Sequence, residues 1–426
     1  MSGDVTSATP CVFLYQEQVE ELWRRFAGSG ASQQRRALGM ELDDGDVYHV
    51  YTSPPRTHFA GVPCPAVVDL RAVLSVGSND DIPQLGLRNG ARVVVLLTVV
   101  NNRIRGRAFV DRQGSWVEGT ATFVPVRTEL YARSSGLLET DALARKSVAV
   151  VGLGSGGSTI AIALAQAGIG RMVLVDRDRL EIGNVSRHAC GVGDLGRLKT
   201  RAVRDLVLGK NPAIDVSMHD IDIVEQPDAL RAGLEGVDLA IAATDGDVSR
   251  FLINQVALDL QLTTVFGRVL TRATGGDVLR VRPRQGPCLA CVYTKQFLRQ
   301  RPREYSREAE AREDAEAYMS ESDINAKIQV GLASDIAPVA NLITKIALVE
   351  LSRDTGGGLE VLDADLRADF YIWANRREGT YAEWPAMEFS FGKPSILRWY
   401  GANVPRRAEC GACGVADVVE PGFFGS

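Results

Sequence analysis

The chain has 426 residues, of which 45% are hydrophobic, enough for a large core and for two or three domains. Its 48 Lys and Arg against 53 Asp and Glu leave a net charge of −5, which gives no reason to expect nucleic acid or a lipid surface as the main partner. The sequence contains no apolar run of about 18 residues and no secretory signal at its start, so we expect a cytoplasmic protein without a membrane span.

Residues 1–127 contain no catalytic motif and are predicted to form a separate α+β domain. The spacing of apolar residues over 12–26 predicts an amphipathic helix, and the β-branched run Val93–Val100 predicts a buried strand. We interpret this domain as one that recruits a partner or takes part in dimer assembly.

Residues 128–426 alternate predicted strands and helices, which indicates an α/β domain with a doubly wound, mostly parallel sheet. The predicted strands are Ser147–Val151, 172–176, 215–218, 239–243 and 263–266. An apolar helix is predicted over 336–351, and late strands over 368–375 and 395–399.

A glycine loop joins the first of these strands to a helix. Its small residues are Gly152, Gly154, Ser155, Gly156 and Gly157. Backbone N–H groups in such a loop can approach a phosphate, and the positive end of the helix dipole adds to the attraction. Asp176 ends the next strand, where a carboxylate can hold a ribose. Considered alone, this spacing favours a dinucleotide-dependent oxidoreductase.

Further polar residues follow two later predicted strands, 172–176 and 239–243. Asp178, Asn184, Arg187 and Lys199 come after strand 172–176, and Asp245 follows strand 239–243 in Thr-Asp-Gly. Singly, these side chains would be interpreted as a turn residue, surface cations or a helix cap. Together they lie where ligands bind at the carboxyl edge of a parallel sheet, and fixed cations are what phosphate chemistry needs. The pattern therefore predicts a site that consumes a nucleotide.

Four of the seven cysteines form two Cys-x-x-Cys pairs, Cys288 with Cys291 and Cys410 with Cys413. Four thiolates suit a closed, structural Zn²⁺ site, and the fold must bring the distant pairs together. The alternative is a set of redox or buried cysteines.

The motifs in this order resemble those of the ThiF/MoeB family, adenylyltransferases related to ubiquitin-activating enzymes. The resemblance rests on residues 175–188 and 242–246 and on the cysteine pairs, and it extends over about 128–415. It implies a Rossmann-like adenylation domain in which both Cys-x-x-Cys pairs bind one Zn²⁺. It also implies a crossover insertion near 292–330 that lies over the C-terminal tail of a protein substrate. One departure is His188, where the family usually has Gln after Arg187.

The resemblance also implies roles for single residues. Asp176 would hold the ATP ribose, and Asn184, Arg187 and Lys199 would contact the phosphates, with Lys199 favouring the departure of pyrophosphate. Asp245 would bind Mg²⁺. Arg133 matches an arginine that reaches an ATP site across a pseudo-twofold or a true twofold axis, and we expect a homodimer.

The implied function is ATP-dependent adenylation of the C-terminal glycine carboxylate of a ubiquitin-like protein, for transfer to a thiol. We expect a bacterial activator, with a conjugating enzyme as a further candidate partner. However, the sequence has no Cys between Val292 and Glu409, where the family places its catalytic Cys. Either the acyl-adenylate passes to another protein's thiol, or the nucleophile has been replaced, with Ala333 as the candidate position.

Three other functions are weighed against this one. A tRNA-modifying enzyme that adenylates a small carboxylate would need a basic surface, which the pI of about 5.6 does not favour. A dinucleotide-dependent oxidoreductase leaves Arg187, Lys199 and Asp245 without a purpose. An inactive nucleotide-binding scaffold would not need a complete set of adenylation residues.

Overall fold

The computed structural model describes residues 8–26, 33–56, 61–71, 81–101, 103–294, 331–353, 355, 359–386 and 394–414. The chain divides into two compact parts, an N-terminal unit, Met1–Arg133, and a C-terminal unit, Ser134–Ser426. Among the described helices, none combines the length and the apolar character needed to cross a membrane.

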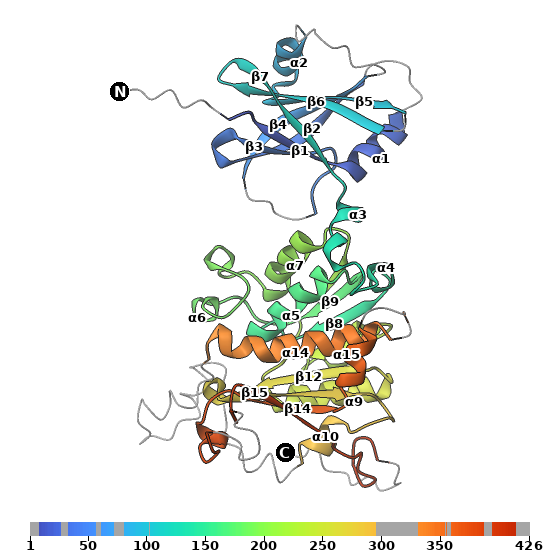
Figure 1. Ribbon diagram of the computed structural model, residues 1–426, viewed down its shortest axis with the longest axis vertical. Helices are drawn as coiled ribbons and strands as arrows, with labels where there is room; N and C mark the ends of the chain where they lie inside the picture. The colour runs from blue at the N-terminus through green and yellow to red at the C-terminus, as the bar shows by residue number, and fades with distance from the viewer. Residues whose placement is uncertain are drawn as a thin grey trace, which may run out of the picture. The chain divides into compact units, whose positions relative to one another are not determined.

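The N-terminal unit is a closed barrel with the strand order β1-β3-β2-β4-β5-β6-β7 (Figure 1). The strands are β1 (Cys11–Tyr15), β2 (Gln33–Leu42), β3 (Val47–Tyr51), β4 (Val62–Leu70), β5 (Val93–Val100), β6 (Arg103–Arg112) and β7 (Ser115–Val124). The helices are α1 (Gln16–Phe26), α2 (Ile82–Asn89) and the short α3 (Val126–Glu129). The α+β character predicted for this region is confirmed, and the strand predicted over Val93–Val100 is β5.

The helix predicted over 12–26 is wrong at its start. Val12 and Leu14 are fully buried while Cys11, Phe13 and Tyr15 are half-buried, which is the two-residue alternation of a strand. The first four residues of the predicted helix therefore lie in β1, and α1 begins at Gln16.

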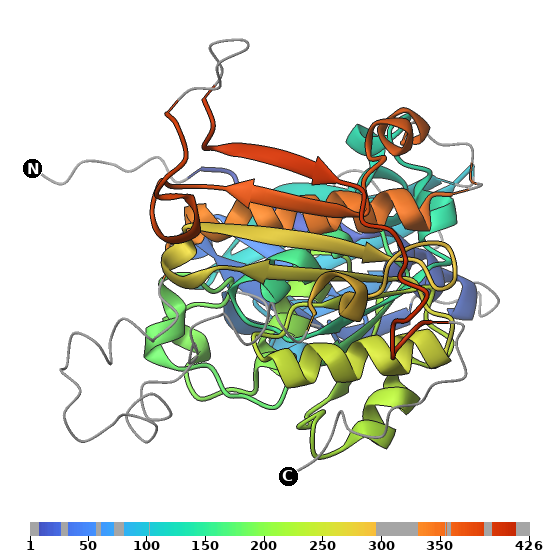
Figure 2. The same ribbon diagram turned by 90° about the horizontal axis from the view of Figure 1, so that it is seen from below.

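The C-terminal unit is built on an eight-stranded sheet with the order β10-β9-β8-β11-β12-β13-β14-β15. The strands are β8 (Ser147–Val151), β9 (Arg171–Val175), β10 (Asp215–His219), β11 (Leu239–Ala242), β12 (Thr264–Val269), β13 (Gly275–Val281), β14 (Phe370–Ala374) and β15 (Arg398–Ala402). Strands β8 to β12 are parallel to one another, and β13 to β15 extend the sheet antiparallel (Figure 2). This is the predicted α/β class with a mostly parallel, doubly wound half.

Helices cover both faces of this sheet. They are α4 (Thr140–Leu143), α5 (Ser155–Gln166), α6 (Ile182–Val185), α7 (Lys199–Lys210), α8 (Pro227–Leu234), α9 (Asp247–Asp259), α10 (Leu289–Val292), α14 (Ala333–Leu351) and α15 (Glu360–Asp365). Val148 and Val150 of β8 pack with α5, α7 and α14, while Ala149 and Val151 pack with α8 and α9. Since both faces of β8 are buried, its sequence is a continuous apolar run.

The predicted elements of this unit differ from the observed ones mainly at their ends. Helix α14 begins at Ala333 instead of residue 336, and β15 begins at Arg398 instead of residue 395. Strand β13 was not predicted, because its sequence opens with two glycines and contains Asp and Arg. The part of the predicted crossover insertion that spans residues 295–330 lies outside the described residues.

Candidate functional site

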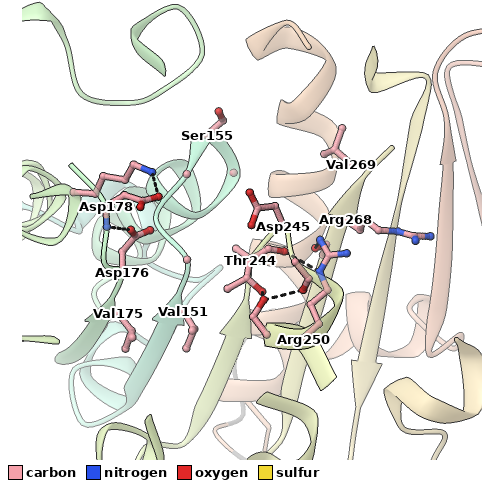
Figure 3. Close-up of a pocket in the computed structure, with 18 of the residues that line it drawn as sticks. Val151, Ser155, Val175, Asp176, Asp178, Thr244, Asp245, Arg250, Arg268 and Val269 are labelled. Carbon is pink, nitrogen blue, oxygen red and sulfur yellow. Dashed lines mark hydrogen bonds and ion pairs between the residues drawn. The ribbon is translucent and has the colours of Figure 1, made fainter. Parts of the chain in front are cut away.

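A cavity of about 650 Å³ opens at the carboxyl ends of the parallel strands of the C-terminal unit (Figure 3). Ten of the residues predicted for the nucleotide site line it: Gly152, Gly154, Ser155, Gly156, Asp176, Asp178, Asn184, Arg187, Lys199 and Asp245. Gly157 lies in the first turn of α5 and is not part of this lining. Arg133 belongs to the short 3₁₀ turn Ala132–Ser134 at the end of the N-terminal unit.

The glycine loop follows β8 and is fixed by packing against the next parallel strand. Gly152 has φ +89°, and a Cβ there would lie 2.8 Å from the backbone of Ala243 and Thr244. A Cβ on Gly157 would lie 1.9 Å from the carbonyl oxygen of Gly152. These two positions accept only glycine, because helix α5 starts in contact with the end of the strand.

The other two glycines of the loop face open space. A Cβ on Gly154 would meet nothing within 4 Å, and one on Gly156 only a methyl of Ile336 at 3.9 Å. Gly154 is the N-cap of α5 and no side chain caps this end. The first N–H groups of α5 therefore face the cavity, which suits an anionic oxygen.

Asp176 comes directly after β9, and its carboxylate braces the loop. Oδ2 accepts a hydrogen bond from the Leu153 N–H at 2.6 Å, and Oδ1 accepts one from the Asp178 N–H at 2.8 Å. Burial raises the pKa of this carboxyl, while Lys199 and the two N–H groups act in the opposite direction. The residue is thus positioned beside the cavity by the glycine loop itself.

Lys199 is the first residue of α7, and its side chain is 11% exposed. Its Nζ lies 3.0 Å from Oδ2 of Asp178. Two residues predicted independently for the site are therefore an ion pair in the cavity wall.

Asn184 and Arg187 lie on and just after the short helix α6. Oδ1 of Asn184 accepts a hydrogen bond from the Glu181 N–H at 3.1 Å, which caps this turn. Both side chains line the cavity and are half-buried.

His188 is the position that departs from the family pattern, and the structure gives it a clear role. Its Nδ1 accepts a hydrogen bond from the Cys190 N–H at 3.0 Å. Nε2 therefore carries the proton and donates to the carbonyl oxygen of Leu153 at 2.7 Å. Burial lowers the pKa of this imidazole. A neutral His188 thus ties the segment after α6 to the glycine loop.

Asp245 follows β11 and is exposed in the cavity between the glycine loop and β12 (Figure 3). The turn that carries it is held by Arg250, a residue of α9 that sequence reasoning missed. Nε of Arg250 donates to the carbonyl oxygen of Thr244 at 2.8 Å, and Nη2 donates to that of Gly267 at 3.2 Å. The sequence signal that could have identified Arg250 is its position four residues after Gly246, on the buried side of α9.

A second unpredicted arginine, Arg268 of β12, lies on the sheet beside this site. Its Nε and Nη2 donate to Oδ2 of Asp277 at 3.0 and 2.5 Å. The hydroxyl of Tyr293 donates to Oδ1 of the same carboxylate at 2.5 Å, and the guanidinium lies 4.7 Å from the centre of the Tyr293 ring. This buried network connects β12 and β13 to the segment just after the first cysteine pair.

The four paired cysteines come together although 122 residues separate the pairs. Cys288, Cys291, Cys410 and Cys413 place their sulfurs within 4.8 Å of one another. The sulfurs of Cys288 and Cys410 are 3.6 Å apart, and those of Cys291 and Cys413 are 3.5 Å apart. Sulfurs about 2.3 Å from a tetrahedral Zn²⁺ would be about 3.8 Å apart, so the cluster fits this ion.

The model of the ThiF family matches residues 128–357, more than half of the chain. The chain belongs to the ThiF family. Among curated proteins it is similar to ubiquitin-like modifier-activating enzyme 5 of Caenorhabditis elegans, with 29% identity over 163 residues, 36% of this chain and 39% of the relative. It is also similar to the adenylyltransferase and sulfurtransferase MOCS3 of Aedes aegypti, with 34% identity over 155 residues, 35% of this chain and 34% of the relative.

The match spans about two fifths or less of these two relatives. Among solved structures, MccB of Escherichia coli aligns with a TM-score of 0.47 and 16% identity, covering 65% of this chain and 66% of MccB.

Proposed function

We propose that this member of the ThiF family is an adenylyltransferase that uses ATP to activate the C-terminal glycine carboxylate of a ubiquitin-like protein. One observation carries the proposal: the glycine loop, Asp176, Lys199 and Asp245 all line the same cavity. The relatives named as activating enzymes of ubiquitin-like modifiers support the class of substrate.

In the proposed reaction, a carboxylate oxygen of the substrate forms a bond to the α-phosphorus of ATP. The bond from that phosphorus to the bridging oxygen breaks, and its electron pair leaves with pyrophosphate. Asp176 would hold the ribose, while the N–H groups of α5 with Asn184, Arg187 and Lys199 would stabilise the phosphate charge. The exposed carboxylate of Asp245 suits Mg²⁺, which would neutralise charge that develops on the phosphates.

The product of this reaction is proposed to leave as the acyl-adenylate. Four cysteines of the C-terminal unit belong to the candidate Zn²⁺ site. The fifth, Cys190, is a poor nucleophile, because it is buried and burial raises the pKa of its thiol to about 12. Residue 333, the candidate for a replaced nucleophile, is the first residue of α14 and is Ala. We propose that a thiol of another protein, a conjugating enzyme among the candidates, takes the acyl group.

The other candidate functions have less support. A dinucleotide-dependent oxidoreductase has no need for the cavity-lining Lys199 and Asp245. An inactive scaffold would not need them either. The remaining alternative is a tRNA-modifying enzyme that adenylates a small free carboxylate. The test below distinguishes this substrate from a ubiquitin-like protein.

The test is exchange of labelled pyrophosphate into ATP by the full chain, with and without a purified ubiquitin-like protein that ends in Gly. We expect exchange only with the protein present, and a loss of at least about 100-fold in Asp245→Ala. Asp259→Ala is the matched control, because Asp259 lies at the other end of α9. Exchange with free small carboxylates alone, or hydride transfer with a nicotinamide cofactor, would contradict the proposal.

A further inference from the structure

The site residues follow the order of the strands along the sheet edge. Asp176 follows β9, the glycine loop follows β8, Asp245 follows β11, and Gly267 lies in β12. In the sheet these strands are adjacent in the order β9-β8-β11-β12. If the ribose and phosphates occupy the first half of this row, the β12 end of the cavity is where the acyl group must lie.

The β12 end of the cavity is mostly apolar. Val269 and Leu270 line it from β12 and the residues after it, and Ile336 and Val339 line it from α14. The cations that line this end in the described part of the chain are Arg250 and Arg268.

Arg268 is already neutralised. It makes the buried ion pair with Asp277, and its side chain points away from Asp245 in Figure 3. It therefore contributes to the framework of the sheet, and Arg250 is the cation at this end that could meet a ligand.

Arg250 is a buried cation whose side-chain hydrogen bonds go to carbonyl oxygens and whose ion pair is long. The residue is 7% exposed, and carbonyl oxygens accept its Nε and Nη2 hydrogen bonds. Within the described residues, its one ion pair joins Nη1 to Oδ1 of Asp247 at 4.0 Å, and the Asp247 side chain is 46% exposed. Burial and the nearby Arg268 lower the pKa of Arg250, while Asp277, Tyr293 and Asp247 act in the opposite direction. A buried charge of this kind is stabilised by an anion.

We infer that Arg250 binds the carboxylate of the acyl substrate, with Nη1 donating to the oxygen that becomes the carbonyl oxygen of the acyl-adenylate. The inference rests on the proposed function. The two carbonyl oxygens hold the guanidinium plane, so that Nη1 is oriented before the substrate enters. The other carboxylate oxygen is then directed along the row toward the phosphates, where it attacks the α-phosphorus.

The test measures binding of two small probes to the full chain by calorimetry, without Mg²⁺. The probes are 5′-O-sulfamoyladenosine and 5′-O-(N-glycylsulfamoyl)adenosine, which differ in the glycyl group and in the negative charge that acylation places on the sulfamate nitrogen. We expect Arg250→Gln to weaken binding of the glycyl probe about 10-fold or more, the usual loss for a hydrogen bond to a charged group, and binding of sulfamoyladenosine less than about 2-fold.

Two controls keep the outcome interpretable. Arg231→Gln removes an arginine at the exposed surface of α8 and should bind both probes as the unaltered chain does. If Arg250→Gln does not fold, Arg250→Lys keeps the charge but loses the planar fork, and we expect it to bind the glycyl probe about 5-fold more weakly.

Equal losses for both probes would show that Arg250 only positions the Thr244–Gly246 turn, and this would overturn the inference. An unchanged affinity of Arg250→Lys for the glycyl probe would overturn it too. Failure of the unaltered chain to bind either probe, together with the absence of pyrophosphate exchange, would instead contradict the proposed function.

Discussion

Lys199 and Asp178 are linked twice in the wall of the nucleotide cavity. The Lys199 Nζ lies 3.0 Å from Oδ2 of Asp178, and the Lys199 N–H donates to the Asp178 carbonyl oxygen at 2.9 Å. The first link places the ammonium group, and the second holds the start of α7 against the segment that follows β9. The cation is thus oriented before a nucleotide binds, which is the arrangement that stabilises developing charge most effectively.

We predict that Lys199→Met lowers the rate of ATP–pyrophosphate exchange about 100- to 1,000-fold, because the preoriented cation beside the leaving group is lost. Lys210→Met, at the other end of the same helix, is the control and should keep full activity. Single-turnover measurements of acyl-adenylate formation at saturating ATP check the effect on the chemical step. A Lys199→Met enzyme of normal rate would remove this residue from the mechanism.

The cysteine cluster predicts about one Zn²⁺ per chain. Metal analysis of the purified protein should find roughly one equivalent, and Cys410→Ser should lose it. Because ligation of a structural Zn²⁺ can contribute on the order of 10 kcal/mol to folding, this variant should unfold at a much lower temperature.

Cys11→Ser is the matched control for the zinc prediction, because Cys11 is a half-buried residue of the N-terminal barrel. It should keep both the metal and the stability. A metal-free protein that is as stable as the Zn²⁺ form would show that the four sulfurs are not a metal site.

His188 predicts a loss of stability at acid pH. Its pKa is lowered in the folded chain, so the unfolded chain binds the proton more readily, and stability is lost as the pH falls below the unfolded value of about 6.5. Protonation at Nδ1 would also break the hydrogen bond from Cys190. The loss should approach at most about 1.4 kcal/mol per pH unit.

The control for His188 is His188→Gln, whose amide can still donate to Leu153 but does not titrate. Urea unfolding between pH 5 and 8 should show a smaller pH dependence for this variant than for the unaltered chain. Identical pH dependence in the two proteins would show that His188 does not control stability in this range.

The nucleotide half of the site was predictable because its residues follow one another in a short stretch of sequence. A glycine loop, a strand-end carboxylate and a downstream cation are local features, and the parallel order of the strands brings them to one edge. Asp245 could be added because Thr-Asp-Gly again ends a strand. The roles assigned to these residues remain proposals, but their common cavity could be expected from the chain alone.

The other half of the site could not be predicted in the same way. Arg250 and Arg268 acquire their environment from carbonyl oxygens and a carboxylate on neighbouring strands, which no local pattern reveals. The helix expected over 12–26 was wrong at its start for a related reason, because four residues of alternating burial before α1 are compatible with either element until the barrel closes around them.

Arg133 carries the prediction of a twofold assembly. The residue ends the N-terminal unit, whereas Lys199 belongs to the cavity of the C-terminal unit. If Arg133 completes the site of the opposite subunit, Arg133→Ala and Lys199→Ala should each be inactive, and an equal mixture should regain about a quarter of the activity. Only mixed dimers would then hold one intact site, because each chain supplies what the other lacks. Arg127→Ala with Lys199→Ala is the matched mixture: if Arg127, six residues earlier, has no role, this mixture should show about half the activity. Confirmed mixed dimers without recovery in the first mixture would exclude an arginine acting between subunits, and Arg133 would then be a solvated surface residue.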